Sequence, residues 1–119
     1  MDRAEFKNVY KNASENLDVA ETVKFLTNKY KNEKLMSFCA WEEYYVLAIE
    51  EMSELQKELT KGLRLKGDTY GLLEELADVY ICLMYVQIAA GFTGEHINKA
   101  INVKISEIKR KMKECEVDD

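Results

Sequence analysis

Proline is missing from this sequence, and glycine and histidine are scarce, with five and one in 119 residues. Proline and glycine weaken helices most, so a chain that has few of them and is rich in Glu, Lys, Leu and Ala favours an all-α fold. No apolar run reaches the roughly 18 residues that a membrane span needs, so no membrane partner is expected. The length suits one domain with a single modest core.

Cysteine and clustered positive charge are also sparse. The three cysteines are odd in number and far apart, which matches neither a disulfide framework nor the spacing of zinc ligands. The net charge is −5 and the lysines are scattered, so no nucleic-acid partner is expected. The first residues contain no apolar signal core. These features predict a small acidic protein of the reducing cytoplasm.

The chain divides into three parts by pattern. An N-terminal helical segment covers 1–38, a helical core covers 39–115, and an acidic tail covers 116–119. Apolar residues recur at helical spacing through the first two parts. The sequence therefore predicts an all-α bundle of four to five helices.

Capping residues place the ends of these helices. Asp18 followed by Glu21 is typical of a capping box, and Gly62 and Gly91 are placed to end helices as left-handed caps. The polar cluster 31–34 is expected to interrupt the second helix. The predicted helices are 3–13, a segment opening at Asp18, 40–61, 69–90 and 95–114.

A block of acidic and apolar residues occurs twice, at 48–55 and at 72–79. Each copy reads apolar-apolar-acid-acid-apolar-small-acid-apolar, and the offset is 24 residues. Each copy holds two carboxylates three residues apart, which makes them neighbours on one helix face. The two pairs are Glu51 with Glu54 and Glu75 with Asp78.

The connector between the two copies predicts that the pairs meet. Helices joined by a short loop normally pack antiparallel, and this loop, 62–68, has its midpoint at residue 65. Two pairings across such a hairpin centre on 64.5: Glu51 with Asp78, and Glu54 with Glu75. An antiparallel hairpin would therefore bring four carboxylates level with one another.

A solvated helix face is the alternative interpretation of these acids. Glu54 lies well round from the apolar stripe of its helix, as a solvated residue would. The second helix favours a site, because from 76 to 90 only Asp78 and Gln87 are polar, and a buried carboxylate is costly unless it is paired or bound to metal. The stripe of the first helix is Tyr45, Ala48, Ile49, Met52, Leu55, Leu59 and Leu63.

Neither acidic motif contains histidine, and this decides the metal. The one histidine, His96, is expected on the surface in the first turn of the last helix. Carboxylates without imidazole prefer a hard cation, so Mg²⁺ is expected, with Mn²⁺ as the substitute. Protein-bound Mg²⁺ usually shares its shell with water and substrate phosphate, which favours hydrolysis of a phosphoanhydride.

The two motifs resemble the signature of the MazG-like all-α nucleoside triphosphate pyrophosphohydrolases. The matching residues are Glu50-Glu51-x-x-Glu54 and, after 20 residues, Glu75-x-x-Asp78, within a resemblance that covers about 41–112. The resemblance implies Mg²⁺-dependent cleavage of an NTP or dNTP between the α- and β-phosphates, which yields the monophosphate and pyrophosphate. It also implies a helical core that forms oligomers.

The resemblance implies roles for particular residues. Those that match the metal ligands are Glu51, Glu54, Glu75 and Asp78. One of Glu50, Glu51 and Glu54 would orient or deprotonate the attacking water. Asn102 and Lys104 match a stretch that helps to hold phosphates. Lys57 and Lys61 share the acidic face, where they could neutralise it or contact phosphate, but helix salt bridges are the role expected of them.

Several alternatives stay open at the level of sequence. A dUTPase belongs to the same class, as does a phosphoribosyl-ATP pyrophosphohydrolase, whose relatives usually carry a histidine after the second motif where 79–83 has none. A non-catalytic helical interaction module is the alternative outside the class. A homodimer or homotetramer is expected, because the helix over 70–90 is too apolar for one chain to enclose. Aromatic residues that could form a base pocket or a core are Phe38, Trp41, Tyr44 and Tyr85.

Overall fold

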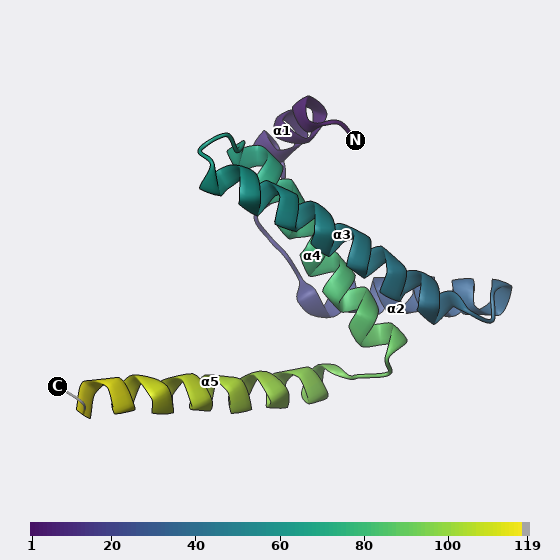
Figure 1. The fold of residues 1–119 in the computed structure, drawn as a ribbon. Coiled ribbons are helices and arrows are strands. Elements are labelled where there is room, and N and C mark those ends of the chain that lie inside the picture. The colour runs from purple at the N-terminus through teal and green to yellow at the C-terminus, as the bar shows by residue number, and fades with distance from the viewer. Residues whose placement is uncertain (118–119) are drawn as a thin grey trace.

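The structure is a computed structural model that describes residues 1–117, and that part of the chain holds five α-helices and no strand (Figure 1). The all-α prediction is therefore confirmed. Asp118 and Asp119, the end of the predicted acidic tail, lie outside the described residues. The helices are α1 (Arg3–Lys11), α2 (Val19–Met36), α3 (Ala40–Leu63), α4 (Thr69–Ala89) and α5 (Gly94–Val117).

Aspartates begin three of the helices, because a carboxylate accepts from the free backbone N–H groups of a first turn. Asp18 accepts from the Glu21 N–H at 3.1 Å, which confirms the predicted cap of α2. Asp68 accepts from the Tyr70 N–H at 3.0 Å at the start of α4. Gly91 follows α4 with a φ of +82°, so it supplies the left-handed conformation that ends this helix.

Three predicted boundaries are wrong. The polar cluster 31–34 does not interrupt α2, because Lys and Glu are good helix formers and Lys29 pairs with Glu33 at 2.6 Å one turn away. Gly62 does not cap α3, which continues to Leu63, and the left-handed residue of this turn is Leu65 with a φ of +56°. The first helix is also shorter than the predicted span 3–13, because it ends at Lys11.

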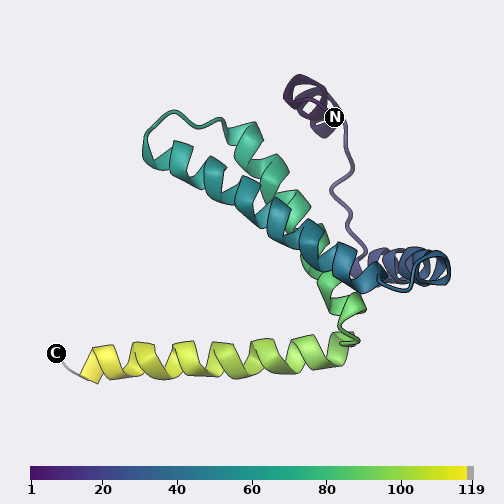
Figure 2. The ribbon, with the colours of Figure 1, turned by 45° about the vertical axis from the view of Figure 1, so that its right-hand side comes forward.

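The helices α3 and α4 form the antiparallel hairpin that the connector length predicts (Figures 1 and 2). Its turn is tight, because a Cβ on Gly67 would lie 3.2 Å from the Gly62 Cα atom. The helix α2 packs across the open end of the hairpin, and α1 packs on α4 near the turn. The acidic motifs therefore lie on the paired middle of the hairpin.

The core is small and lies where α2 meets the open end of the hairpin. Tyr30 of α2 and Ala40 and Tyr44 of α3 are its buried members. The Tyr44 ring lies 5.4 Å from the Tyr30 ring and 4.5 Å from the Tyr85 ring of α4, measured between centroids. Of the predicted aromatic set, Tyr44 and Tyr85 thus belong to the core, while Phe38 is 94% exposed.

An ion pair links the first helix to α3 near the hairpin turn, beside the contacts that Lys7 and Tyr10 make with the Tyr70 ring of α4. Arg3 of α1 donates to the Glu58 carboxylate of α3 at 2.9 Å, and Glu58 is buried. The guanidinium passes over Gly71 of α4, where a Cβ would collide with it. Lys61 adds a second contact to Glu58 at 3.3 Å. A single side chain therefore ties α1 to both helices of the hairpin.

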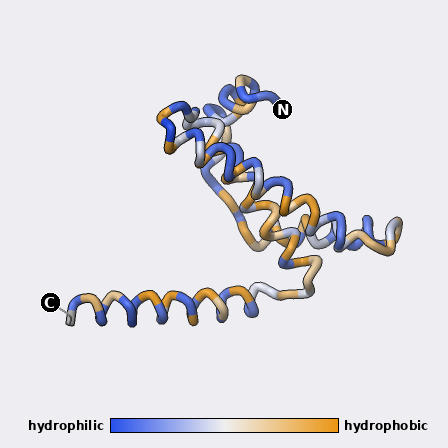
Figure 3. The backbone as a smooth tube through the Cα atoms, viewed as in Figure 1, coloured by the Kyte–Doolittle hydropathy of each residue, from blue (hydrophilic) through white to orange (hydrophobic). Residues whose placement is uncertain are grey.

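Large apolar surfaces remain exposed. The apolar stripe predicted for α3 lies mostly outside the core: Ile49 is 65% and Leu63 is 87% exposed. The side of α3 that faces α4 carries Glu51 and Glu58 instead. The helix α5 packs on none of α1–α4 and extends away from them (Figure 1), and its hydrophobic and hydrophilic residues alternate by turns (Figure 3). Its exposed apolar residues include Ile101, Val103, Ile105, Ile108 and Met112.

Within residues 1–117, each helix taken singly falls short of the length and apolarity that crossing a bilayer requires. The pair formed by α4 and α5 meets that requirement only when the two are added together, and they are bent by 116° at their junction.

Candidate metal centre

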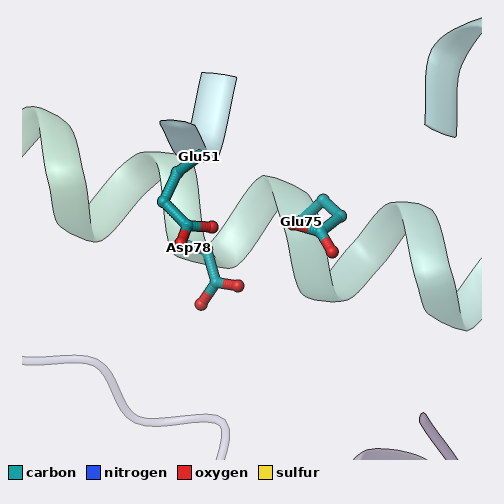
Figure 4. Close-up of side chains that lie close together, drawn as sticks. All are labelled: Glu51, Glu75 and Asp78. Atoms are coloured by element: carbon teal, nitrogen blue, oxygen red, sulfur yellow. The ribbon is translucent and has the colours of Figure 1, made fainter. Parts of the chain in front are cut away.

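Three of the predicted ligands converge in the middle of the hairpin. Glu51 comes from α3, and Glu75 and Asp78 come from successive turns of α4 (Figure 4). One carboxylate oxygen from each of the three lies within 4.8 Å of the others, and all three residues are half-buried. The pairing of Glu51 with Asp78 across an antiparallel hairpin is the register that the sequence predicts.

These three carboxylates repel one another and are partly removed from water. Burial, and then the charges of Asp78, Glu54 and Glu50, raise the pKa of Glu51. Burial raises the pKa of Glu75 as well, followed by the charges of Asp78 and Glu51, and burial raises the pKa of Asp78. Each shift disfavours the ionised form, so the cluster is electrostatically strained without a cation.

No ion pair within residues 1–117 relieves this repulsion. Across the part of the chain that the structure describes, no Lys or Arg side chain forms an ion pair with Glu51, Glu75 or Asp78. A group of oxygen ligands with surplus negative charge suits a hard divalent cation. The residues present therefore fit Mg²⁺ or Mn²⁺, with room left for water or phosphate in the shell.

Glu54 and Glu50 lie beside this cluster and remain exposed. Glu54 is paired with Lys57 at 3.1 Å, so its carboxylate is not among the three that converge. Its charge nevertheless raises the pKa of both Glu51 and Glu75. Glu50 is exposed on the neighbouring face of α3, toward α2. Both carboxylates are thus accessible to a molecule that approaches the cluster from solvent.

The basic and amide residues expected near phosphate are dispersed in one chain. Lys57 and Lys61 form helix salt bridges, with Glu54 at 3.1 Å and with Glu58 at 3.3 Å. Asn102 and Lys104 lie on α5, which packs on no other helix, so within one chain they are remote from the cluster.

Cys82 and His96 are of residue types that bind metals, but both lie outside the carboxylate cluster. Cys82 is buried one turn beyond Asp78, and burial together with the charges of Glu51 and Asp78 raises its pKa to about 11, so it remains a thiol at neutral pH. His96 is exposed in the first turn of α5, as predicted, and its Nδ1 accepts from the Thr93 N–H at 2.9 Å. Neither residue supplies a ligand to the carboxylate cluster.

One element of this region escaped the sequence reasoning. Lys29 and Glu33 of α2 meet Tyr44 of α3 beside a cleft that opens next to Glu50. The i,i+4 spacing of Lys29 and Glu33 was a local signal of a salt bridge. The contact of the Lys29–Glu33 pair with Tyr44 depends on the angle at which α2 crosses the hairpin. A local sequence pattern does not reveal that angle.

Three comparisons of the chain with known proteins found no match. No protein-family model, no curated protein and no solved structure matches it. The resemblance to the MazG-like class therefore depends on the acidic motifs of the sequence alone.

Proposed function

We propose that the protein is a Mg²⁺-dependent nucleoside triphosphate pyrophosphohydrolase, which converts an NTP or dNTP into the monophosphate and pyrophosphate. The observation that supports this most is the convergence of three half-buried carboxylates, from two helices, on one point with no cation partner. The bound cation would supply charge neutralisation for the phosphate oxygens and lower the pKa of its water. Mn²⁺ would substitute for Mg²⁺ at such a site.

We assign the roles of these carboxylates by how exposed each one is. Glu51, Glu75 and Asp78 are half-buried and would hold the cation. Glu54 would complete the ligand set by exchanging its partner Lys57 for the cation, which frees Lys57 for phosphate. Glu50 is exposed beside the cluster, so it is our choice for the group that orients or deprotonates the attacking water.

We also propose that the active form is a homodimer or homotetramer. The exposed fractions of Ile49, Leu63 and Tyr80 are 65%, 87% and 66%, and these residues lie on both helices of the hairpin. Apolar surface of this extent is rare on a stable monomer. The unpacked helix α5 would bring Asn102 and Lys104 toward the hairpin of a second chain, where they could contact phosphate.

A non-catalytic helical interaction module is the second candidate, and the same exposed apolar surface favours it. The two candidates differ in what they require of the carboxylates. An enzyme needs Asp78 ionised and bound to a cation, whereas an interaction module gains nothing from Mg²⁺. A dUTPase or a phosphoribosyl-ATP pyrophosphohydrolase remains an option within the enzyme class and is separated from the rest by substrate.

The test is a screen of the eight common NTPs and dNTPs with Mg²⁺ and detection of pyrophosphate. We expect pyrophosphate and a monophosphate from at least one substrate, and no product in excess chelator. Asp78→Asn should abolish turnover, while the matched neighbour Glu74→Gln should retain it, because Glu74 lies outside the converging group. Release of orthophosphate alone, or full activity in chelator, would contradict the proposal.

A further inference from the structure

A cleft of about 550 Å³ lies between α2 and α3, beside the carboxylate cluster. Its volume is within the range of small-molecule sites. Glu50 lines the cleft, and Glu51, the next residue, belongs to the cluster, so the two sites adjoin on α3. The lining residues are Lys29, Glu33, Glu42, Glu43, Tyr44, Val46, Leu47 and Glu50.

One side of the cleft is a fixed hydrogen-bonded network. Lys29 pairs with Glu33 at 2.6 Å and donates to the Tyr44 hydroxyl at 3.2 Å, and that hydroxyl donates to Glu33. The Lys29 ammonium also lies 5.3 Å from the centroid of the Tyr44 ring and 5.1 Å from that of the Tyr85 ring. Lys29, the one cation among the described residues that line the cleft, is therefore already satisfied by protein groups.

The remaining polar groups of the cleft are carboxylates. Glu42, Glu43 and Glu50 are exposed and have no ion-pair partner within the described residues. An ionised carboxylate only accepts hydrogen bonds. A ligand that suits this cleft must therefore present N–H donors, and it cannot place its own phosphates here because the charges repel.

The charge along α3 gives the substrate a direction. The cleft end of the helix is acidic, while Lys57 and Lys61, each ion-paired with a glutamate of α3, follow the cluster toward the turn. Lys57 becomes available to phosphate when Glu54 binds the cation instead. The seven helical steps from Tyr44 to Glu51 span about 10 Å at the rise of an α-helix, which is comparable to a nucleoside. A nucleotide would therefore point its phosphates toward Lys57 and its base toward the acidic cleft.

We propose that the α2–α3 cleft is the nucleoside subsite, and that it selects bases whose edge carries an amino group. Guanine presents an imino and an amino donor on one edge, and adenine and cytosine present an amino donor, whereas uracil and thymine offer a single imino donor between two carbonyl acceptors. Carboxylates accept from the first group and repel the carbonyls of the second. This assignment depends on the proposed function only for the place of the phosphates, and it disfavours a dUTPase.

The test uses free nucleosides, which need no metal. Guanosine, cytidine and uridine are titrated into the full chain and followed by calorimetry and by NMR shifts of residues that line the cleft. We expect guanosine and cytidine to bind at least about tenfold more tightly than uridine. Val46→Trp should fill the cleft and weaken guanosine binding by a similar factor. Val9→Trp on α1 is the matched control, because Val46 is 53% and Val9 is 52% exposed.

A second variant guards against an effect of the bulky side chain on folding. Glu43→Gln keeps the shape of an exposed residue and removes one acceptor charge, so the preference for guanosine over uridine should shrink. Unchanged guanosine binding in both Val46→Trp and Glu43→Gln, or equal binding of uridine, would overturn the assignment. Absence of pyrophosphate release with cleft binding intact would instead contradict the proposed function and leave the subsite standing.

Discussion

Glu51 and Asp78 face each other across the α3–α4 hairpin, with carboxylate oxygens no more than 4.8 Å apart although the residues are 27 positions apart in the sequence. Both are half-buried, and each raises the pKa of neighbouring groups, Glu75 and Cys82 among them. The two ionised carboxylates repel each other, and a divalent cation bound between them would remove this repulsion. The stability of the protein should therefore depend on divalent cations and on pH.

Mg²⁺ or Mn²⁺ should raise the thermal stability of the protein, because a ligand that binds only the folded state stabilises it. At a metal concentration about 100 times the dissociation constant, the gain is ~2.7 kcal/mol. Thermal unfolding with metal and with chelator measures it. Asp78→Asn should lose the gain and unfold no earlier than the parent in chelator, since one repelling charge is gone. His96→Ala should keep the gain, and loss of it there would contradict the assignment of ligands.

The metal-free protein should be more stable at mildly acidic pH than at pH 7. The folded-state pKa values of Glu51, Glu75 and Asp78 are raised, so their ionisation costs stability at neutral pH, and this cost falls as the pH drops through those values. Glu33 and Glu58 have lowered pKa values, so their contribution is lost only below the ordinary glutamate value of 4.5. Denaturant unfolding in chelator should therefore show a maximum between these ranges, and a monotonic fall from pH 7 would contradict this prediction.

Arg3→Ala should destabilise the fold. It removes the main partner of the buried Glu58 carboxylate, whose pKa is held low chiefly by the Arg3 hydrogen bond. Leaving a buried acceptor poorly satisfied costs about 1–3 kcal/mol. Lys11→Ala, an exposed residue on the same helix with no ion pair in the described chain, is the control. Equal unfolding midpoints for the two variants would show that α1 is not held by this contact.

The protein should assemble through α5 and the exposed hairpin face. Ile101, Ile105 and Ile108 recur at spacings of four and three, so they form one seam on α5, and Val103 lies on the opposite side. Light scattering should report a mass of at least twice the 13.8 kDa of one chain. Ile105→Lys should lower that mass, and Val103→Lys should not. A folded parent of single-chain mass would refute this prediction.

Much of the fold is predictable because the signals are local. Asp18 and Asp68 begin helices and Gly91 ends one, since a cap depends on groups a few residues away. At the end of α3 the left-handed residue is Leu65 and not Gly62, and Gly67 approaches Gly62 closely across the turn. That approach is a contact across a turn, which local patterns describe poorly.

The sequence by itself determined the all-α class, the hairpin and the pairing of Glu51 with Asp78, because helix periodicity and a short connector leave one antiparallel register. Only the tertiary structure decided that Glu54 stays outside the converging group on Lys57, that Tyr44 meets Lys29 and Glu33 beside a cleft, and that α5 packs on no helix of its own chain. These outcomes depend on the angles at which helices cross and on which side chains then compete for one partner. Packing between segments that are distant in the sequence decides these contacts, and the adjacent residues do not.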